Sequence, residues 1–367
     1  MSIFIFFIIL LVLVLVHEFG HFFTAKSFGI RVDEFGFGFP PKLFSFKRGE
    51  TEYSFNLLPI GGFVKIFGEN PDQENTYGSD SARSFVNKAK YKQAIVLLAG
   101  VFMNLLLAWV LFSFGFMSGL PTSVGSEPPG YTLEDVNLVV VSVVESSPAA
   151  TAGLKSGDKI VYVSDGEEGL EKINPETIKS FIVSHPNQEL EIGYIRGKIT
   201  EDPIFTKITP STGSSNSTPT IGISMDQIGV AKLPILTAFK EGLSLTWYVT
   251  KSTAVGLFRL IIDSFRGRGS LDAVTGPVGL VGIVGDAYQF GLAYLFSFAA
   301  LISINLAIIN LFPFPALDGG RLLFLLIEKI KGSALNPKFT NMANTVGFGI
   351  LIILMLFITY RDVVKLF

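Results

Sequence analysis

The chain has 367 residues, of which 49% are hydrophobic and 16% charged, and its mean hydropathy is +0.49. This composition is too apolar for an ordinary soluble protein of this length, so it predicts an integral membrane protein. The net charge of −2 gives no sign of a nucleic-acid partner, and we expect none. The absence of cysteine excludes disulfides, iron–sulfur clusters and cysteine-rich zinc sites, but it does not identify the compartment.

The first predicted transmembrane helix covers residues 2–25, and every residue from Ile3 to Val16 is apolar. It has no basic leader and no small-residue cleavage site, so we expect a retained helix and not a signal peptide. The run ends in His17-Glu18-Phe19-Gly20-His21. Residues four apart share a helix face, so His17 and His21 can hold one metal ion while Glu18 reaches a metal-bound water. The alternative is a polar helix end, although such groups are costly beside an apolar run without partners.

Residues 26–92 show short aromatic alternation, as in Phe35-Gly-Phe-Gly-Phe39, broken by glycines, prolines and charged turns. This pattern predicts membrane-associated β-hairpins. A helical substrate must unwind before its peptide bonds can be cleaved, and a free sheet edge near the metal can pair with the extended segment. Gly61 and Gly62 are therefore candidate substrate-binding residues. The alternative is a structural hairpin that packs under the helices.

A second transmembrane helix is predicted at 93–120, and together with residues 1–92 it forms the first domain. Residues 121–226 then form a linker and one soluble α+β module. Within it, Leu138–Val144 has the pattern of a strand, Ser147–Ala152 that of a short helix, and 153–160 that of a turn entering another strand. This order resembles a PDZ domain, which either binds a peptide end or excludes bulky ectodomains. A flexible loop is expected at 211–220.

Residues 227–286 are predicted to lie at the membrane interface. Apolar positions at helical spacing are interrupted there by charged residues, among them Lys240, Lys251, Arg259 and Asp263. An amphipathic interfacial helix is therefore expected in place of a fifth span.

The C-terminal domain, 287–367, contains predicted transmembrane helices at 288–312 and 339–360. Between them lies Asn310-Leu-Phe-Pro-Phe-Pro-Ala-Leu-Asp318-Gly-Gly320, whose prolines and glycines break the helix. Non-helical backbone at membrane depth is tolerated where it is buried in protein or lines a wet cavity. Asn305 and Asn310 either hold the backbone of a substrate or form hydrogen bonds between helices.

The scarcity of histidine constrains the third metal ligand. A catalytic zinc usually has three protein ligands, cysteine is absent, and the one other histidine, His185, lies in a polar segment. The third ligand should therefore be Asp or Glu, and Asp318 is the best candidate because it follows a long uncharged stretch. Its alternative is a helix cap or a turn aspartate.

The charges of the loops predict the orientation of the spans. Residues 26–92 carry ten Lys and Arg, whereas residues 121–226 carry seven against fifteen Asp and Glu. The first loop is therefore expected in the cytoplasm, and both termini and the soluble module outside it. The first and third spans then run in the same direction, which brings His17, His21 and Asp318 to a similar depth.

The paired motifs identify the resemblance. The chain resembles the site-2 proteases, specifically the sigma-E-regulating type of bacterial intramembrane zinc metalloprotease, through HEFGH at 17–21, NLFPFPALDGG at 310–320, GPVG at 276–279 and the PDZ-like segment. The resemblance implies a Zn²⁺ cofactor held by His17, His21 and Asp318, with Glu18 as the catalytic carboxylate. It also implies substrate contacts at Asn310 and, less directly, Asn305. Many members carry two PDZ modules, whereas 136–226 accommodates one.

The expected protein is thus mainly α-helical and multi-pass in the bacterial inner membrane, with four transmembrane helices, β-hairpins and an inserted PDZ-like domain. By the resemblance, it cleaves transmembrane segments of single-span proteins, such as anti-sigma factors or remnant signal peptides. Its partners would be these substrates, the lipid bilayer and a peptide ligand of the PDZ-like domain. Two alternatives are a non-catalytic membrane adaptor and a metal transporter, neither of which requires Glu18 as a general base.

Overall fold

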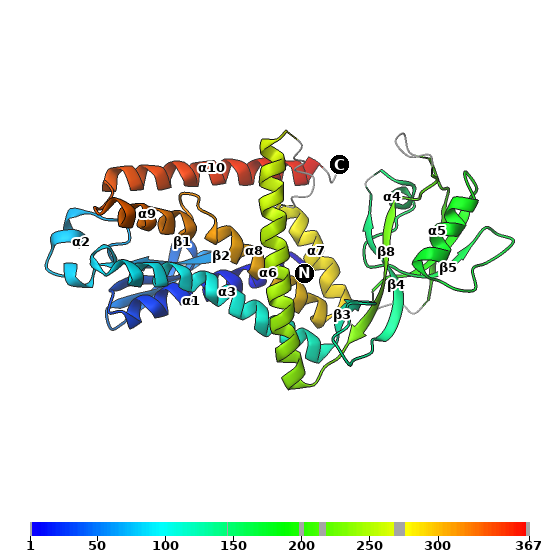
Figure 1. The fold of residues 1–367 in the computed structure, drawn as a ribbon, viewed down its shortest axis with the longest axis horizontal. Coiled ribbons are helices and arrows are strands. Elements are labelled where there is room, and N and C mark those ends of the chain that lie inside the picture. Colours follow the sequence, from blue (N-terminus) through cyan, green and yellow to red (C-terminus); the bar gives the residue numbers. More distant parts are fainter. Residues whose placement is uncertain (1, 145, 198–201, 213–217, 268–275, 365–367) are drawn as a thin grey trace. The chain divides into compact units, whose positions relative to one another are not determined.

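The computed structural model describes residues 2–144, 146–197, 202–212, 218–267 and 276–364 (Figure 1). The chain divides into two compact units. The membrane unit comprises Met1–Phe112, Gly242–Gly285 and Phe298–Phe367. The β unit comprises Ser113–Glu241 and Asp286–Ser297.

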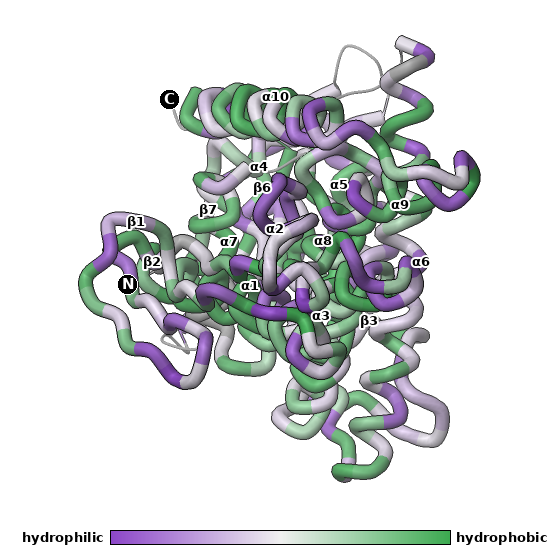
Figure 2. Tube along the Cα trace, turned by 90° about the vertical axis from the view of Figure 1, so that its left-hand side faces the viewer, coloured by the Kyte–Doolittle hydropathy of each residue, from purple (hydrophilic) through white to green (hydrophobic). Residues whose placement is uncertain are grey.

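Four helices in the described part of the chain are long and apolar enough to cross a membrane. They are α1 (Ser2–Ser27), α3 (Lys90–Ser118), α8 (Leu292–Leu311) and α10 (Pro337–Val364). These helices confirm the four predicted spans to within a few residues. Only 6% of the apolar window of α10 is buried, and Figure 2 colours much of this helix as hydrophobic. Such an exposed apolar surface is suited to lipid, as expected of an integral membrane protein.

The other helices of the described chain are shorter or more polar. They are α2 (Gln73–Tyr77), α4 (Pro148–Thr151), α5 (Pro175–Ser184), α6 (Ile235–Phe265), α7 (Pro277–Phe290) and α9 (Asp318–Lys331). α6 contains the charged residues that argued against a fifth span, and it is not among the candidate spans. Part of the predicted interfacial segment, residues 268–275, lies outside the described residues.

The predicted β-structure after α1 consists of β1 (Val32–Arg48) and β2 (Thr51–Ile66). Gly36 of β1 has partners in both halves of β2, namely Phe63 and Ser54. The two long strands therefore fold back on themselves, and the sheet is wider than a simple hairpin. The last segment of β2 lies at one edge, where its residues 62–66 pair with the start of β1.

A buried cluster fixes this sheet to the membrane helices. The cluster joins the end of α1, the sheet and the beginning of α3, and consists of Ala25, Ile30, Val32, Ile66, Phe85, Val96 and Leu97. Each of these side chains is less than a tenth exposed. The hydrophobic contact holds the edge of β2 beside the part of α1 that carries the histidines.

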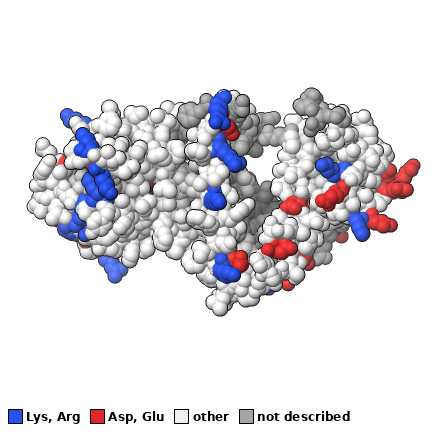
Figure 3. Space-filling model, in the orientation of Figure 1, with Lys and Arg blue, Asp and Glu red and all other residues white. Residues whose placement is uncertain are grey.

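In the β unit, a six-stranded sheet forms within the described residues, in the order β3-β8-β4-β5-β6-β7. Its strands are β3 (Leu120–Ser123), β4 (Glu134–Val143), β5 (Lys159–Ser164), β6 (Leu190–Ile195), β7 (Ile204–Ile208) and β8 (Ile223–Ala231). Ser147 caps the predicted short helix, α4. Residues 213–217 of the expected loop lie outside the described residues. Most of the Asp and Glu visible in Figure 3 lie on this unit.

The fold class is therefore only partly as expected. The membrane helices and the α+β module are present, but helices account for little more than half of the chain. "Mainly α-helical" describes the membrane unit and overstates the whole, because the two long strands and the six-stranded sheet contribute much of the structure. The PDZ identity of the module stays a prediction.

The core of the β unit leads to a prediction. Ile178 of α5 is fully buried against the sheet, so Ile178→Ala should destabilise this unit by about 2–5 kcal/mol through lost burial and a cavity. Pulse proteolysis of the purified protein in urea would measure the change. Val183→Ala, on the exposed side of the same helix, is the matched control and should change stability by less than about 1 kcal/mol. Equal effects of the two variants would contradict this packing.

Candidate metal centre

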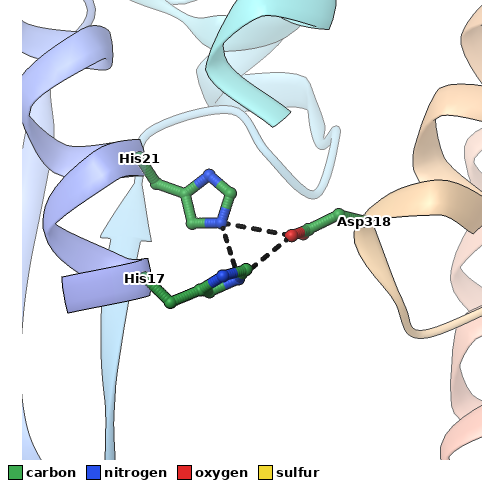
Figure 4. A group of neighbouring side chains, drawn as sticks. All are labelled: His17, His21 and Asp318. Carbon is green, nitrogen blue, oxygen red and sulfur yellow. Dashed lines mark hydrogen bonds and ion pairs between the residues drawn. The ribbon is translucent and has the colours of Figure 1, made fainter. Parts of the chain in front are cut away.

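The two histidines project from one face of α1, near its C-terminal end (Figure 4). Their four-residue spacing is just over one helical turn, so the two rings lie one above the other. Each histidine is 7% exposed, and the two Nε2 atoms are 3.1 Å apart. The helix thus supplies two nitrogen atoms directed to the same point.

Asp318 reaches this point from the first turn of α9, after the chain has left α8. The connecting segment, residues 312–317, contains Pro313 and Pro315, and Ala316 has a left-handed backbone with φ +76°. Asn344 of α10 accepts a hydrogen bond from the Ala316 N–H at 3.1 Å. An unfavourable backbone conformation of this kind persists only where its surroundings hold it, as this contact does.

Gly319 and Gly320 allow the chain to turn back tightly at Asp318. A Cβ on Gly319 would lie 2.2 Å from the Leu311 carbonyl oxygen, and one on Gly320 would lie 2.2 Å from that of Phe314. Neither position can accept a side chain without moving backbone. The glycines therefore bring the start of α9 close to the end of α8, which directs Asp318 toward α1.

The three side chains form a compact donor set. Asp318 Oδ2 lies 3.1 Å from His17 Nε2 and 3.2 Å from His21 Nε2. These separations approach the roughly 3.3 Å edge of a tetrahedron with bonds of about 2.0–2.1 Å, the geometry of protein zinc sites. Two imidazole nitrogens and one carboxylate oxygen therefore fit zinc and leave a fourth position for water. In the described residues, this is the one such group of His, Asp and Glu side chains.

The charge of Asp318 suits this arrangement. Burial by itself would raise the pKa of the Asp318 carboxyl, but the adjacent His21 and His17 imidazoles hold that pKa well below its usual range. An ionised carboxylate is the form of aspartate that binds a metal ion. Asp318 opens α9 without capping it, so the helix-cap alternative does not describe its side chain.

Glu18 lies beside the donor set on α1, half-buried, and shares the cavity wall with Val64 at the edge of β2. The donor set and Glu18 line a cavity of about 280 Å³. Asn310 of α8 lies on the same cavity wall, together with Phe63 and Val64 of β2. The cavity thus leaves space for water beside the three donors.

The closeness of α1 and α3 shapes the other wall. A Cβ on Gly20 would lie 2.5 Å from the Ala99 carbonyl oxygen, so the two backbones are nearly in contact. A Cβ on Gly100 would lie 2.4 Å from His21 Nε2 and 2.6 Å from His17 Cε1. Gly100 therefore leaves the space that both imidazole rings occupy.

The predicted site residues divide into two groups. His17, Glu18, His21, Asp318 and Asn310 come together at the cavity.

Asn305 is exposed on α8 and is not among the residues that line the cavity. Gly61 and Gly62 also lie off the cavity wall, on β2, where they approach Phe39, Val14 and Leu15. The edge strand does reach the site, but through the neighbouring Phe63 and Val64. Close packing against α1 therefore accounts for these two glycines.

Sequence reasoning missed three polar residues that line the cavity, which are Asn104, Glu69 and Arg321. Asn104 is a fully buried amide inside the apolar span α3, and a polar group at such a position is a signal that could have been used. Arg321 lies one helical turn after Asp318 and pairs with Glu69. The pairing itself could not be inferred, because Glu69 is 252 residues away in the chain.

Comparisons with known proteins agree with this geometry. The profile of peptidase family M50 matches residues 5–354, which include every residue of the cavity wall. A Clostridium perfringens protein is 34% identical over 353 residues, covering 96% of this chain and 95% of its own.

Two further relatives are named as proteases. The regulator of sigma-W protease RasP of Bacillus subtilis is 30% identical, covering 99% of this chain and 98% of its own. The zinc metalloprotease RasP of Geobacillus kaustophilus is also 30% identical, covering 97% and 96%. With a family match along nearly its whole length and a buried zinc donor set beside a carboxylate, the chain belongs to peptidase family M50, the site-2 proteases, and is a zinc metalloendopeptidase.

Proposed function

We propose that this protein is an intramembrane endopeptidase that hydrolyses peptide bonds in the transmembrane segments of single-span membrane proteins. The observation that supports this most directly is the position of the donor set. His17 and His21 lie on the first apolar span, and Asp318 follows the third. Asn104, within the second apolar span, lines the same cavity, so the reaction would take place among membrane helices.

In this proposal His17, His21 and Asp318 hold zinc, and Glu18 is the catalytic carboxylate. When bound, zinc supplies a Lewis acid that polarises the scissile carbonyl and makes water more acidic. Glu18 accepts the proton of the attacking water and then returns a proton to the leaving amine. Glu18 faces the cavity that the three donors line, so its carboxylate can reach the attacking water.

The edge of β2 is the proposed docking strand for substrate. A transmembrane helix hides its peptide bonds in its own hydrogen bonds, so the segment to be cleaved must unwind and find other partners. Residues 62–66 of β2 pair with β1, and Phe63 and Val64 line the cavity. An extended substrate could add to this edge, with Asn310 binding its backbone. Gly61 and Gly62 would contribute by packing closely on α1, and Asn305 would contact the substrate outside the cavity.

We further propose an anti-sigma factor or a remnant signal peptide as the substrate class. The printed name of the Bacillus subtilis relative, a regulator of sigma-W protease, supports a regulatory substrate of the first kind. The β unit would serve as a PDZ-like domain that either binds a peptide end or excludes proteins with bulky ectodomains. We propose four domains, which cover residues 1–120, 121–226, 227–286 and 287–367.

The proposed location is the bacterial inner membrane, with both termini and the β unit outside the cytoplasm. The asymmetry of Lys and Arg between loops 26–92 and 121–226 supports this orientation.

The first prediction concerns the general base. Glu18→Gln should lower cleavage of a purified single-span substrate in detergent by roughly 10²- to 10⁴-fold, because the amide cannot accept the proton of water. Zinc content, measured by elemental analysis, should stay near one ion per chain, because the substitution leaves His17, His21 and Asp318 intact. Glu171→Gln, the same change at an exposed position of the β unit, is the matched control.

Other outcomes of this experiment distinguish the alternatives. Undiminished cleavage by Glu18→Gln would reject the proposed role. A membrane adaptor or a metal transporter would function equally well with Glu or with Gln at position 18. Asp318→Ala removes one of the three donors and should lose zinc, and retention of wild-type zinc affinity would show that the ligand assignment is wrong.

The second prediction concerns the space around the imidazoles. Gly100→Ala should displace both rings and weaken zinc binding at least about tenfold, measured by competition with a chelator. Gly256→Ala in α6 adds the same methyl group where nothing lies within 4 Å, so its zinc affinity should equal that of the wild type. Wild-type affinity in Gly100→Ala would contradict the close approach of α3.

The third prediction tests orientation. Since the chain has no cysteine, single cysteines can be placed without background labelling. Ser126→Cys, in an exposed loop of the β unit, should react with a membrane-impermeant maleimide on intact cells. Ser333→Cys, between α9 and α10, should react only after permeabilisation. The reverse labelling pattern would overturn the proposed topology.

A further inference from the structure

One face of α3 lies directly behind the two histidines. Val96, Gly100 and Asn104 are spaced by four residues, so they share this face. Gly100 lies against both imidazole rings, and the other two residues lie on either side of it. The face therefore contacts both imidazole rings, at His21 Nε2 and at the Cε1 and Nδ1 atoms of His17.

The partner of His21 on this face is a backbone carbonyl. His21 Nδ1 lies 2.8 Å from the Val96 oxygen, so the ring donates its Nδ1–H to that oxygen. The proton on Nδ1 leaves the lone pair of Nε2 free, and Nε2 is the atom directed at Asp318 and His17. The hydrogen bond thus fixes the tautomer that a metal ligand needs.

His17 has the same requirement but a different partner. Its Nε2 also points to the shared position, so a neutral ring must carry its proton on Nδ1. The side chain that faces Nδ1 is Asn104, whose amide lies 3.5 Å away. The Oδ1 atom of Asn104 is buried and has no hydrogen-bond partner among the described residues.

A half-turn of the Asn104 amide brings these two groups together. The oxygen and nitrogen of an amide have nearly the same shape, and hydrogen bonding decides which faces a neighbour. With Oδ1 toward the ring, a buried acceptor meets the Nδ1–H donor, whereas the opposite orientation sets two donors against each other. The backbone of Asn104 is itself held, because Ser303 of α8 donates a hydrogen bond to its carbonyl oxygen at 2.8 Å.

We propose that Asn104 is a positioning residue that accepts a hydrogen bond from His17 Nδ1–H and so fixes the tautomer and direction of this zinc ligand. The proposal rests on the proposed role of His17 as a ligand. Val96 and Asn104 together would form an outer shell supplied by one face of α3. Loss of such a partner typically weakens metal binding roughly 10- to 100-fold.

Two substitutions at Asn104 separate hydrogen bonding from packing. Asn104→Leu keeps a similar volume but removes the acceptor, and its zinc affinity should fall roughly 10- to 100-fold by chelator competition on the full-length protein. Asn104→Asp keeps an acceptor oxygen and should retain an affinity close to that of the wild type. Thr246→Val is the matched control, because it removes a buried hydroxyl that bonds within its own helix.

Nitrogen-15 NMR of the histidine rings gives a second readout. The chain has three histidines, so each ring can be assigned by single substitution. In the zinc-loaded wild type, His17 and His21 should both show a protected Nδ1–H. In Asn104→Leu the His17 signal should shift and exchange faster with solvent, while the His21 signal should be unchanged because the Val96 carbonyl still accepts the His21 Nδ1–H hydrogen bond.

The outcomes distinguish this inference from the proposed function. If the wild type binds no zinc, the proposed function fails. If the wild type binds zinc and Asn104→Leu binds it equally well, Asn104 does not position His17. Equal losses in Asn104→Leu and Asn104→Asp would also overturn the inference, as would a wild-type His17 whose Nδ1 carries no proton.

Discussion

The close approach of α1 and α3 is the contact on which the site depends. Gly20 of α1 and Gly100 of α3 have no side chain, so the two helices pack with almost no side chain between them. At this distance, α3 contacts both imidazole rings, and its Val96 carbonyl accepts a hydrogen bond from His21 Nδ1–H. A larger residue at either glycine would separate the helices and remove both the space for the rings and the hydrogen bond that orients one of them.

The surroundings make every polar group in this region costly unless it has a partner. Imidazoles and carboxylates lie beside spans in which most residues are apolar, where an unpaired polar group loses several kcal/mol relative to water. The chain offsets this cost by grouping its polar residues. Asp318 lies within 3.2 Å of the Nε2 atoms of both His17 and His21. Arg321 pairs with Glu69 on the cavity wall. The same grouping that lowers the cost of burial also assembles the donor set.

Much of the site could be predicted from sequence because its signals are local. The spacing of His17 and His21 fixes their common face, and the positions of the spans bring Asp318 to their depth. The four spans follow from length and hydropathy alone.

Other features depend on contacts that no local pattern encodes. Asn104 becomes informative only when it is known which face of α3 meets α1. The double pairing of Gly36 and the packing role of Gly61 and Gly62 depend on how two long strands fold back on each other. The pairing of Arg321 with Glu69 joins segments 252 residues apart.

The contact between α10 and the segment before Asp318 makes the site sensitive to the bilayer. Asn344 holds the amide of Ala316, and Gly347 lies against Pro315, so α10 touches the loop that delivers one of the three donors. Most of the apolar window of this helix is exposed. A change of tilt that bilayer thickness imposed on α10 would therefore also move the loop that carries the Asp318 carboxylate.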